Sequence, residues 1–532
     1  MKTTKKGFTL IELIVVIAII GVLAAILVPA MMGKIGTDFM QAQDNGRLTV
    51  TVEVQRGTRI EETAKVARGL EQKFMEIAPE IERISTTAGS NDDSNISVLF
   101  ASTTNYKIQM TVVCSKKYQR ERSITEIAEV LRKELATHAE IIEYNVTTTS
   151  GMGGQGESTV DVEIYGFDFD ATELYGEEMR DLIGERIPGA RNITISRDKD
   201  RPELKITVDK EKLARHGLTA ATVSTYVRNR VAGYTAGYLK EDGDEYDIVV
   251  RLKEENRNTL SAINDFTIPS PTGKLIKLSE VADVEEYWAP QSIDRKSRQR
   301  YLKVSVAPYK TSLGQLATEI QKVVDENPAP SGVTVVLGGT YEDQQDNFKD
   351  LAMLAVLIIM LVYIVMASQF ESLSKPAILL LALPFAASGI ILSLWVTNTT
   401  LDMIGALGAI MLVGIAVKNG IVLVDYINLM RDRGYELNEA IALSGASRLR
   451  PVLMTAFTTL LGMVPMAVSN GEGSEMWQPL GIVVIGGLLV STLVTLIIVP
   501  VSYALMSRHG ERDKEEKARK EYIFMQIDVD KQ

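Results

Sequence analysis

Long apolar stretches interrupt the polar sequence at six places, and each is long enough to cross a bilayer. A membrane-spanning helix needs about 20 mostly apolar residues. The first stretch lies at the N-terminus, and the other five follow one another in the last third of the chain. We therefore predict an α-helical membrane bundle of six spanning helices, at residues 8–30, 350–368, 375–397, 401–426, 452–469 and 479–506.

The polar region after the first stretch repeats one pattern four times. Each repeat reads as an alternating strand, a helix with a polar residue at its start, and a second strand. In each helix a Glu or Gln follows the polar residue by three positions, which is the spacing of a capping box. Four such units predict an α+β domain of two ferredoxin-like split βαβ subdomains. The expected capping pairs are Thr58 with Glu61, Ser123 with Glu126, Asp170 with Glu173, and Ser312 with Gln315.

A long insert interrupts the second of these subdomains. Its Gly and Tyr residues punctuate a pattern that predicts a helix pair followed by a hairpin. The resulting division of the chain is an N-terminal signal and membrane helix, a first subdomain, a second subdomain in two pieces, the insert, a five-helix membrane domain and a charged tail. We place them at residues 1–35, 36–157, 158–200 with 296–346, 201–295, 347–507 and 508–532, respectively.

Lysine and arginine are unevenly distributed among the segments that flank the apolar stretches. Lys2, Lys5 and Lys6 precede the first stretch, whereas the connections TNTTLD and SNGEGSEMWQ carry no basic residue. Positively charged flanks stay in the cytoplasm. Both termini are therefore predicted to be cytoplasmic, with the large domain outside the cytoplasmic membrane.

The composition argues against several classes of function. A formal net charge of −11 gives no reason to expect nucleic-acid binding. The single cysteine, Cys114, lies in an apolar-alternating strand and is expected to be a small core residue. The three histidines, His138, His216 and His509, are too far apart for a metal site to be read from their spacing. We found no nucleophile motif or nucleotide-binding loop, so we expect no enzyme and no cofactor.

One predicted spanning helix contains a lysine, Lys418, with apolar residues on both sides. An ammonium inside a bilayer is costly unless it is paired. Asn419 adds a hydrogen-bonding amide beside it, and the next helix supplies Arg448 near its cytoplasmic end and Thr455 further in. These residues suggest a proton relay. The alternatives are a packing salt bridge for Lys418 and, for Thr455, a hydrogen bond to its own helix.

Three further residues are weaker candidates. Asp402 and Asp425 fall near the ends of a predicted spanning helix, where we expect a solvated or structural role. Phe100 lies in the turn-rich stretch AGSNDDSNISVLFASTTN. That stretch is either an ordinary surface loop or a mobile loop beside a substrate path.

Three motifs carry a resemblance to a known family: QFESLSKPAILLLALPFAASG, GAIMLVGIAVKNGIVLVDY and SRLRPVLMTAFTTLLGMVPMA. With them, residues 36–506 resemble the C-terminal half of a resistance-nodulation-division (RND) efflux permease, of the hydrophobe/amphiphile, acriflavine-resistance class. The resemblance implies a proton-driven multidrug antiporter of the bacterial inner membrane. It also implies a trimer-like assembly, a periplasmic adaptor and an outer-membrane channel. The two subdomains would form the substrate-handling porter, and the insert would be the docking region.

The same resemblance assigns roles to the membrane residues. It implies that Lys418 pairs with two aspartates on a helix of the N-terminal half, and that Asn419, Thr455 and Arg448 belong to the same relay. The matched region lacks that half. We therefore expect a half-permease that needs an N-terminal half, with an inactive fusion fragment as the alternative.

The first residues, MKTTKKGFTLIELIVVIAII, resemble a type IV prepilin leader and helix. The resemblance implies cleavage after Gly7, methylation of Phe8 and a pilin-type role for Glu12. We interpret the segment as a membrane anchor. The alternative is a pilin- or pseudopilin-type structural component, against which the five further spanning helices argue.

Overall fold

The structure is a computed structural model of the chain. Its contacts divide the chain into two compact units. The first unit has two pieces, one that ends at Ile195 and one that begins at Tyr301, and the second unit comprises Ser196–Arg300. The second unit encloses the predicted insert. The described residues are 35–55, 58–89, 105–148, 157–197, 201–271, 273–289 and 293–529.

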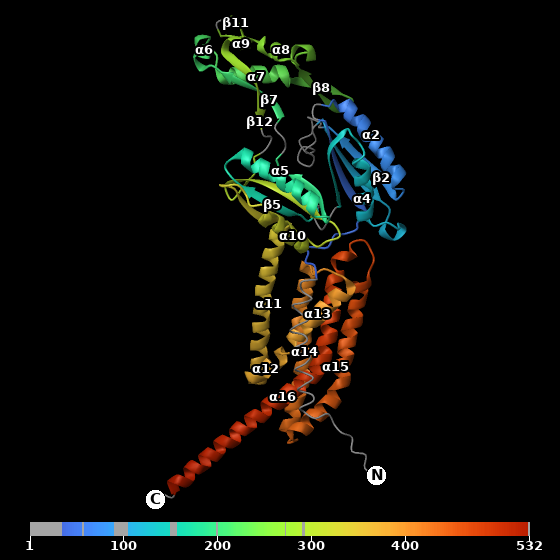
Figure 1. Cartoon of the computed structure of the whole chain (residues 1–532), viewed down its shortest axis with the longest axis vertical. Coiled ribbons are helices and arrows are strands. Elements are labelled where there is room, and N and C mark those ends of the chain that lie inside the picture. The colour runs from blue at the N-terminus through green and yellow to red at the C-terminus, as the bar shows by residue number, and fades with distance from the viewer. Residues whose placement is uncertain are drawn as a thin grey trace. The chain divides into compact units, whose positions relative to one another are not determined.

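The first subdomain is one antiparallel sheet with two helices packed on one face (Figure 1). The strand order is β2-β3-β1-β4, the order in which two βαβ units interlock. In register, Val50 of β1 lies between Met110 of β3 and Val146 of β4, and all three side chains are fully buried. The elements are β1 (Arg47–Val54), α2 (Ile60–Ile77), β2 (Ile81–Ala88), β3 (Lys107–Cys114), η1 (Lys117–Gln119), α4 (Ile124–Leu135) and β4 (Ile141–Thr148).

The second subdomain repeats this arrangement with the strand order β6-β14-β5-β15. Val162 of β5 pairs with Val304 of β14 and Leu337 of β15, and it is buried against α5 and α10. The elements are β5 (Val160–Tyr165), α5 (Phe169–Arg186), β6 (Ala190–Ile195), β13 (Arg295–Lys296), β14 (Gln299–Pro308), α10 (Leu313–Glu326) and β15 (Thr334–Gly339).

Cys114 ends β3 and faces the core of the first subdomain, as predicted from the alternation of its strand. Its side chain is buried, and burial raises the pKa of the thiol to about 11. A thiol that stays protonated is a poor nucleophile. The structure therefore confirms Cys114 as a small core residue.

The capping prediction is right for two of the four helices. Ser123 and Ser312 cap α4 and α10 in complete capping boxes with Glu126 and Gln315. The other two predictions are wrong. Helix α2 begins after Arg59, which makes no side-chain cap, and α5 is capped by Asp168 rather than Asp170. Asp168 accepts from two amides of the first turn, so the helix starts earlier than the spacing suggested.

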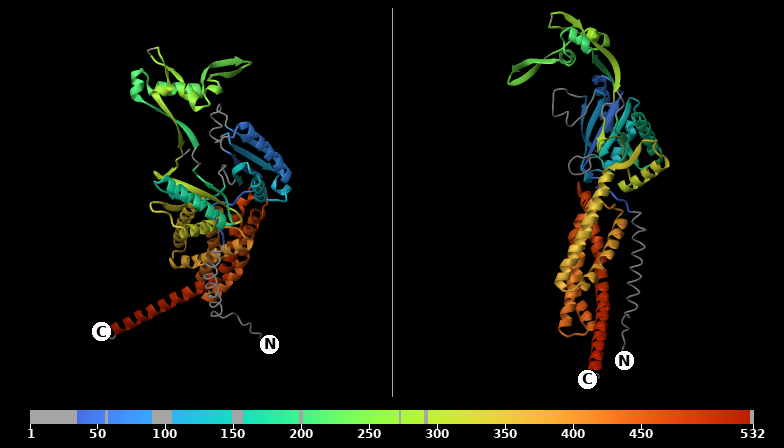
Figure 2. Two further views of the ribbon diagram at one scale, coloured as in Figure 1. Left: turned by 45° about the horizontal axis from the view of Figure 1, so that its top comes forward. Right: turned by 90° about the vertical axis from the view of Figure 1, so that its left-hand side faces the viewer.

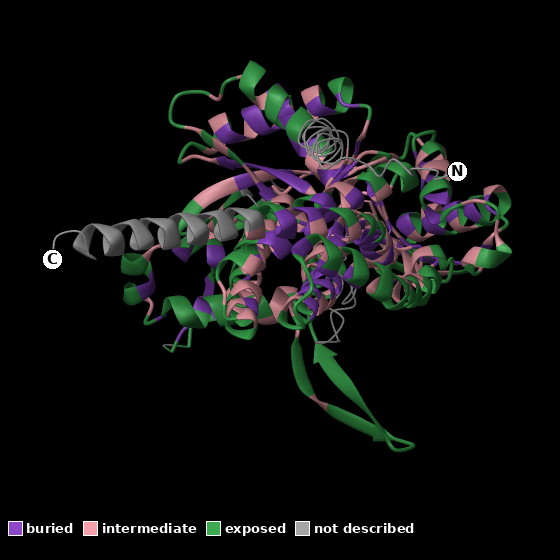
Figure 3. Cartoon of the chain, turned by 90° about the horizontal axis from the view of Figure 1, so that it is seen from below, coloured by how far each residue is buried: buried purple, intermediate pink, exposed green. Residues whose placement is uncertain are grey.

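The second unit confirms the predicted helix pair followed by a hairpin. Both strands of the β8–β9 hairpin are exposed along nearly their whole length (Figure 3). The elements are β7 (Arg201–Val208), α6 (Lys210–Arg215), α7 (Ala220–Val231), β8 (Tyr234–Glu241), β9 (Asp244–Val250), η2 (Glu254–Asn256), α8 (Leu260–Asn264), β10 (Thr267–Pro269), β11 (Leu275–Lys277), α9 (Leu278–Val281) and β12 (Ala282–Ala289).

Within the described residues, five helical segments are long and apolar enough to span a membrane, and they run side by side as a bundle (Figure 2). The sixth predicted span, 8–30, lies outside the described residues. Helix α11 follows β15 without a connecting loop. The elements are α11 (Thr340–Phe370), α12 (Ser374–Leu380), α13 (Leu383–Thr397), α14 (Met403–Asp432), α15 (Leu437–Val468), η3 (Ser474–Met476) and α16 (Gln478–Val529).

Candidate functional site

Helix α14 presents one exposed stripe along the bundle. Its exposed positions between the first and last turns repeat at intervals of three, four or seven residues, which is the period of one helix face. The rest of the helix packs mainly against α16, α15 and α11. The stripe includes Gly414, which has open space where a Cβ would lie, so another helix could approach closely there. Its members are Leu407, Met411, Gly414, Lys418, Asp425 and Leu429.

Lys418 is therefore at the surface of this chain, in the middle of a spanning helix. Within the part of the chain that the structure describes, its ammonium makes no ion pair and no hydrogen bond. Asp425, on the same stripe, is two helical turns away and is also exposed. The predicted packing salt bridge is therefore not seen in the described residues, and the stripe carries a cation in need of a partner.

The other predicted relay residues lie apart from Lys418. Thr455 on α15 is exposed, and its hydroxyl donates to the carbonyl of Val452 at 2.9 Å, the self-satisfied state of a helical threonine. Arg448 stacks on Tyr426 of α14, with the guanidinium carbon 4.4 Å from the ring centroid. No ion pair or hydrogen bond joins Lys418, Thr455 and Arg448 to one another among the described residues, and their shared role stays a prediction.

Asn419 lies on a buried side of α14, about 100° around the helix from Lys418. Its side chain is buried, and its amide donates to the hydroxyl of Thr492 on α16 at 3.3 Å. This bond lies between two closely packed helices. Asn419 therefore fixes how α14 sits on α16, and Thr492 is a residue that the sequence did not point out.

A second group of residues, which the sequence did not reveal, joins the membrane bundle to the porter-like subdomains. We call residues 36–44 the strap. Leu401, in the turn before α14, donates its amide to the carbonyl of Gly36 at 2.9 Å and pairs with Thr37 as a β-bridge. On the other side, the amide of Gly314 in α10 donates to the carbonyl of Thr37 at 2.9 Å. The strap thus lies between a membrane helix and a subdomain helix.

Apolar side chains fix both ends of this contact. Ile35, just before the strap, packs against Leu394 and Val483 of the membrane bundle. Phe39 packs against the core of the second subdomain. A displacement of the strap would therefore disturb both cores.

Gly36 leaves no room for a side chain, which gives a test of the strap. A Cβ at this position would lie 2.5 Å from the Cβ of Ser312 and 3.0 Å from Cγ2 of Thr400. We expect Gly36→Ala to destabilise the strap by about 1–3 kcal/mol, measured by hydrogen exchange of its amides. Gly414→Ala is the matched control, because it sits in open space and should change stability by less than about 1 kcal/mol. Equal effects of the two variants would contradict the tight packing of the strap.

Two aspartates meet where the strap crosses the start of α14. Asp402 caps α14 and accepts from the amide of Gly405 at 2.7 Å, while Asp38 accepts from the amide of Leu313, the first residue of α10, at 2.7 Å. Asp402 is fully buried, and its Oδ2 has no hydrogen-bond partner. The expectation of a solvated Asp402 is therefore wrong, because the strap covers it, although its structural role as a cap is confirmed.

Burial raises the pKa of the Asp38 carboxyl group, against the lowering effect of hydrogen bonds from Thr400 and the Leu313 amide.

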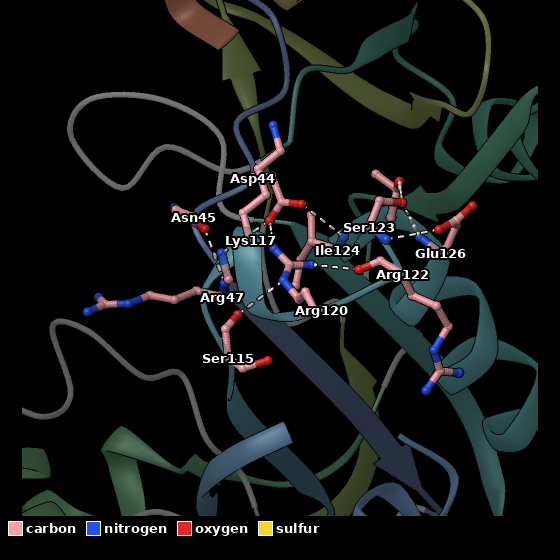
Figure 4. Close-up of polar contacts among 12 residues, drawn as sticks. Asp44, Asn45, Arg47, Ser115, Lys117, Arg120, Arg122, Ser123, Ile124 and Glu126 are labelled. Atoms are coloured by element: carbon pink, nitrogen blue, oxygen red, sulfur yellow. Dashed lines mark hydrogen bonds and ion pairs between the residues drawn. The ribbon is translucent and has the colours of Figure 1, made fainter. Parts of the chain in front are cut away.

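A third aspartate ties the far end of the strap to the first subdomain (Figure 4). Asp44 accepts from the amide of Ile124, the first residue of α4, at 3.2 Å and forms an ion pair with Arg120. The side chain of Arg120 is 1% exposed and also donates to the carbonyls of Ser115 and Arg122 at 3.1 Å. This buried ion pair holds the strap on the start of α4.

A cleft of about 280 Å³ opens between the two subdomains, beside the strap. Its wall combines an aromatic ring with charges of both signs. The guanidinium carbon of Arg191 and the ammonium of Lys310 lie 4.7 Å and 5.2 Å from the ring centroid of Tyr309. Burial raises the pKa of Glu157, which accepts from Asn192 at 2.7 Å. The charged lining residues are Asp38, Arg132, Glu157, Arg191 and Lys310.

Four predicted site residues lie outside the described residues. They are Phe100 of the predicted loop and Gly7, Phe8 and Glu12 of the prepilin-like segment. Their roles stay predictions.

The chain matches a known protein family. A model of the AcrB/AcrD/AcrF family matches residues 6–507. The match includes the first apolar stretch, whose sequence also resembles a prepilin helix. The resemblance of the first residues to a prepilin leader stays a prediction.

Individual relatives include pumps for metal ions and for drugs. The chain is 29% identical over 495 residues to "Cation efflux system protein CzcA" of Alcaligenes sp. (strain CT14), covering 91% of this chain and 46% of that protein. It is 25% identical over 481 residues to "Multidrug resistance protein MdtC" of Erwinia tasmaniensis, covering 90% and 46%. The chain thus spans about half the length of the curated relatives it matches.

The fold also has a close counterpart among solved structures. A crystal structure of a heavy metal efflux pump superposes with a TM-score of 0.76 at 26% sequence identity. The superposition covers 94% of this chain and 51% of the pump chain.

Proposed function

Because the chain belongs to the AcrB/AcrD/AcrF family of RND efflux permeases, we propose that it works as one half of a proton-driven exporter. The observation that carries this proposal is the exposed stripe of α14 with Lys418 at its middle. The stripe needs a second helix to cover it, and Lys418 needs a carboxylate on that helix. An N-terminal half with an aspartate pair, as the family resemblance implies, would supply both.

The chemistry of proton coupling requires such a pair. A carboxyl group in the membrane carries protons only if its pKa lies near neutral pH, where it alternates between charged and neutral forms. Burial raises the pKa of a carboxyl group and a neighbouring ammonium lowers it. Lys418 would be that ammonium, released when the partner carboxylate takes a proton and drawn back when it loses one. Two copies of this chain facing each other would instead oppose two ammoniums.

The wider assembly follows from the same proposal. The chain would lie in the bacterial inner membrane with both termini in the cytoplasm and the two subdomains in the periplasm. Trimer-like protomers, a periplasmic adaptor and an outer-membrane channel would be its partners. The transport would use the proton motive force, without a bound cofactor or an enzymatic step.

For the substrate, we propose hydrophobic or amphiphilic compounds. The cleft between the subdomains supports this class, because its wall places the ring of Tyr309 beside charged side chains of both signs, as an amphiphilic compound requires. The second candidate is a metal cation, which the printed names of CzcA and of the solved heavy metal pump favour. Against it, no group of three or more His, Cys, Asp or Glu residues positioned to hold a metal occurs among the described residues.

Reconstitution in liposomes tests the proposal. The chain alone, under an imposed pH gradient, should transport neither an amphiphilic dye nor Zn²⁺. Together with a separately expressed N-terminal half bearing two aspartates on its facing helix, it should transport the dye in a proton-dependent way. Proton-dependent dye transport by the chain alone would contradict the need for a partner half. Transport of Zn²⁺ but not the dye by the pair would favour the metal-ion alternative.

A further inference from the structure

One side of α15 forms a groove of about 520 Å³, and all the residues that line it come from this one helix. They recur at three- and four-residue steps, so they share one helix face. A spanning helix places such a face against lipid or against another helix. The large apolar side chains of this groove, each at least 45% exposed, are Leu449, Met454, Phe457 and Leu461.

Arg450 is the charged residue among those that line the groove, and it lies near one end of it. Its guanidinium is exposed and, within the described part of the chain, makes no ion pair and no hydrogen bond. The hydroxyl of Thr458, further along the groove, donates to the carbonyl of Met454 at 2.8 Å and is satisfied within its own helix. The groove is therefore amphiphilic, with a cation near one end and an apolar surface along the rest.

The length of the groove matches one leaflet of a bilayer. Arg450 precedes Leu461 by eleven residues, which is about 16 Å of helix. Half of the hydrocarbon core of a bilayer is about 15 Å thick. The predicted span of this helix, 452–469, begins two residues after Arg450. Arg450 therefore lies at the predicted cytoplasmic interface, at the depth of the lipid phosphates.

We propose that this groove binds an anionic phospholipid of the cytoplasmic leaflet, with its phosphate on Arg450 and its acyl chains along Phe457 and Leu461. A guanidinium matches a phosphate group because it donates two parallel hydrogen bonds to the phosphate oxygens. Ser447, which is exposed and one helical turn before Arg450, adds a hydroxyl donor at the same end. This site goes beyond the transport function and requires neither an N-terminal half nor proton coupling.

Helix α11 provides a comparison within the same bundle. It also presents large apolar side chains, such as Val356 and Val365, which are each 68% exposed. Its last turn contains no basic residue, and Glu371 follows its end. An anionic headgroup at that end would meet a carboxylate instead of a guanidinium. The charge at the end of the helix, and not apolar exposure alone, therefore distinguishes α15 as the face for an anionic lipid.

The single guanidinium sets the expected selectivity for the headgroup. One basic residue beside anionic lipid favours that lipid by about fivefold. Phosphatidylcholine carries the same phosphate, but its own ammonium cancels the net charge, so the attraction to Arg450 is lost. The acyl chains of both lipids fit the apolar part of the groove equally, because that part does not contact the headgroup.

Native mass spectrometry of the full chain in detergent tests the proposal, with dioleoyl phosphatidylglycerol and dioleoyl phosphatidylcholine as the probes. The wild type should bind phosphatidylglycerol about fivefold more tightly than phosphatidylcholine. Arg450→Gln should bind the two lipids equally, whereas Arg450→Lys keeps the charge and should keep a preference. Arg433→Gln is the matched control and should behave as the wild type, because Arg433 is an exposed arginine at the end of α14, outside the groove.

Two further measurements separate a lipid from other occupants of the groove. Free glycerol phosphate has the charge but no acyl chains, so it should not displace phosphatidylglycerol, and displacement would overturn the proposal. The wild type should keep its lipid preference when an N-terminal half is bound, and loss of the preference would assign the groove to that half instead. Equal wild-type affinities for the two lipids would also overturn the proposal, as would a preference that Arg450→Gln leaves unchanged.

Discussion

Replacing Lys418 by alanine in the two-half system should lower proton-dependent efflux by about a hundredfold or more, which is the lower range for loss of a group that takes part in proton transfer. The reason is the position of Lys418 on the exposed stripe of α14, where the partner helix would cover it. Without the ammonium, a buried carboxylate on that helix would keep a raised pKa and would not release its proton. Dye transport in liposomes under a fixed pH gradient measures the effect.

The controls for this variant separate transport from folding. Lys349→Ala removes an exposed lysine from the first turns of α11, away from the stripe, and should keep at least half of the wild-type rate. Lys418→Ala should insert into membranes and assemble with the partner half as the wild type does, since the change removes the cost of a charged residue in a spanning helix. A rate above half of the wild-type value for Lys418→Ala would exclude Lys418 from proton coupling.

Replacing Asp44 by alanine should destabilise the first subdomain by about 3–5 kcal/mol, the typical cost of breaking a buried ion pair from one side. The loss leaves the guanidinium of Arg120, which is 1% exposed, without its carboxylate. It also leaves the amide of Ile124 at the start of α4 without its acceptor. Native-state hydrogen exchange of α4 and β1 measures the cost without assuming that the whole chain unfolds in one step.

Two further variants calibrate this measurement. Asp44→Asn retains a side-chain oxygen for the Ile124 amide but loses the charge, so its cost should lie between zero and that of the alanine variant. Glu62→Ala breaks the exposed ion pair with Lys65 on α2, where the Nζ–Oε1 distance is 2.6 Å, and should cost less than about 1 kcal/mol. A cost of Asp44→Ala no larger than that of Glu62→Ala would show that Asp44 does not hold the strap.

The parts of the structure that the sequence predicted are those governed by local periodicity. The four repeats produced two sheets of matching strand order, and the caps at Ser123 and Ser312 formed as their spacing indicated. In α5 a nearby residue took the place of the predicted cap, whereas α2 begins without a side-chain cap. Asp168 precedes Asp170 by two positions and is an equally good capping residue, so the residue types alone could not choose between them.

The strap was not predictable in the same way, because its contacts join residues far apart in sequence. Asp38 and Leu313 are separated by 275 positions, and Asp44 and Ile124 by 80. No periodicity links them, and each aspartate in TDFMQAQDNGR reads as an ordinary polar residue. The burial of Asp402 depends on the same contacts.

Lys418 was only partly predictable from the sequence. A single cation within an apolar helix is visible in any sequence, so its importance could be inferred at once. Whether it faces a neighbouring helix or the outside of the bundle depends on how α14 packs. Only the structure shows that the buried side of α14 contacts α16, where Asn419 donates to Thr492. This contact leaves Lys418 on the exposed stripe.

The direct junction between β15 and α11 has a mechanical consequence. Helix α11 contains 31 residues, about 46 Å of continuous helix, and no loop separates it from the sheet. Because such a helix resists compression, a shift of its membrane end along the helix axis would move β15 by the same distance. Gly339 forms the junction, and its φ of 74° and close approach to Asp161, 2.7 Å from a Cβ placed there, exclude other residues. Gly339 also pairs with Val160 in the sheet, and Tyr341 in the first turn of α11 packs against the core of the same subdomain. The junction is therefore a rigid coupling, and a shift of α11 along its axis would move the sheet of the second subdomain with it.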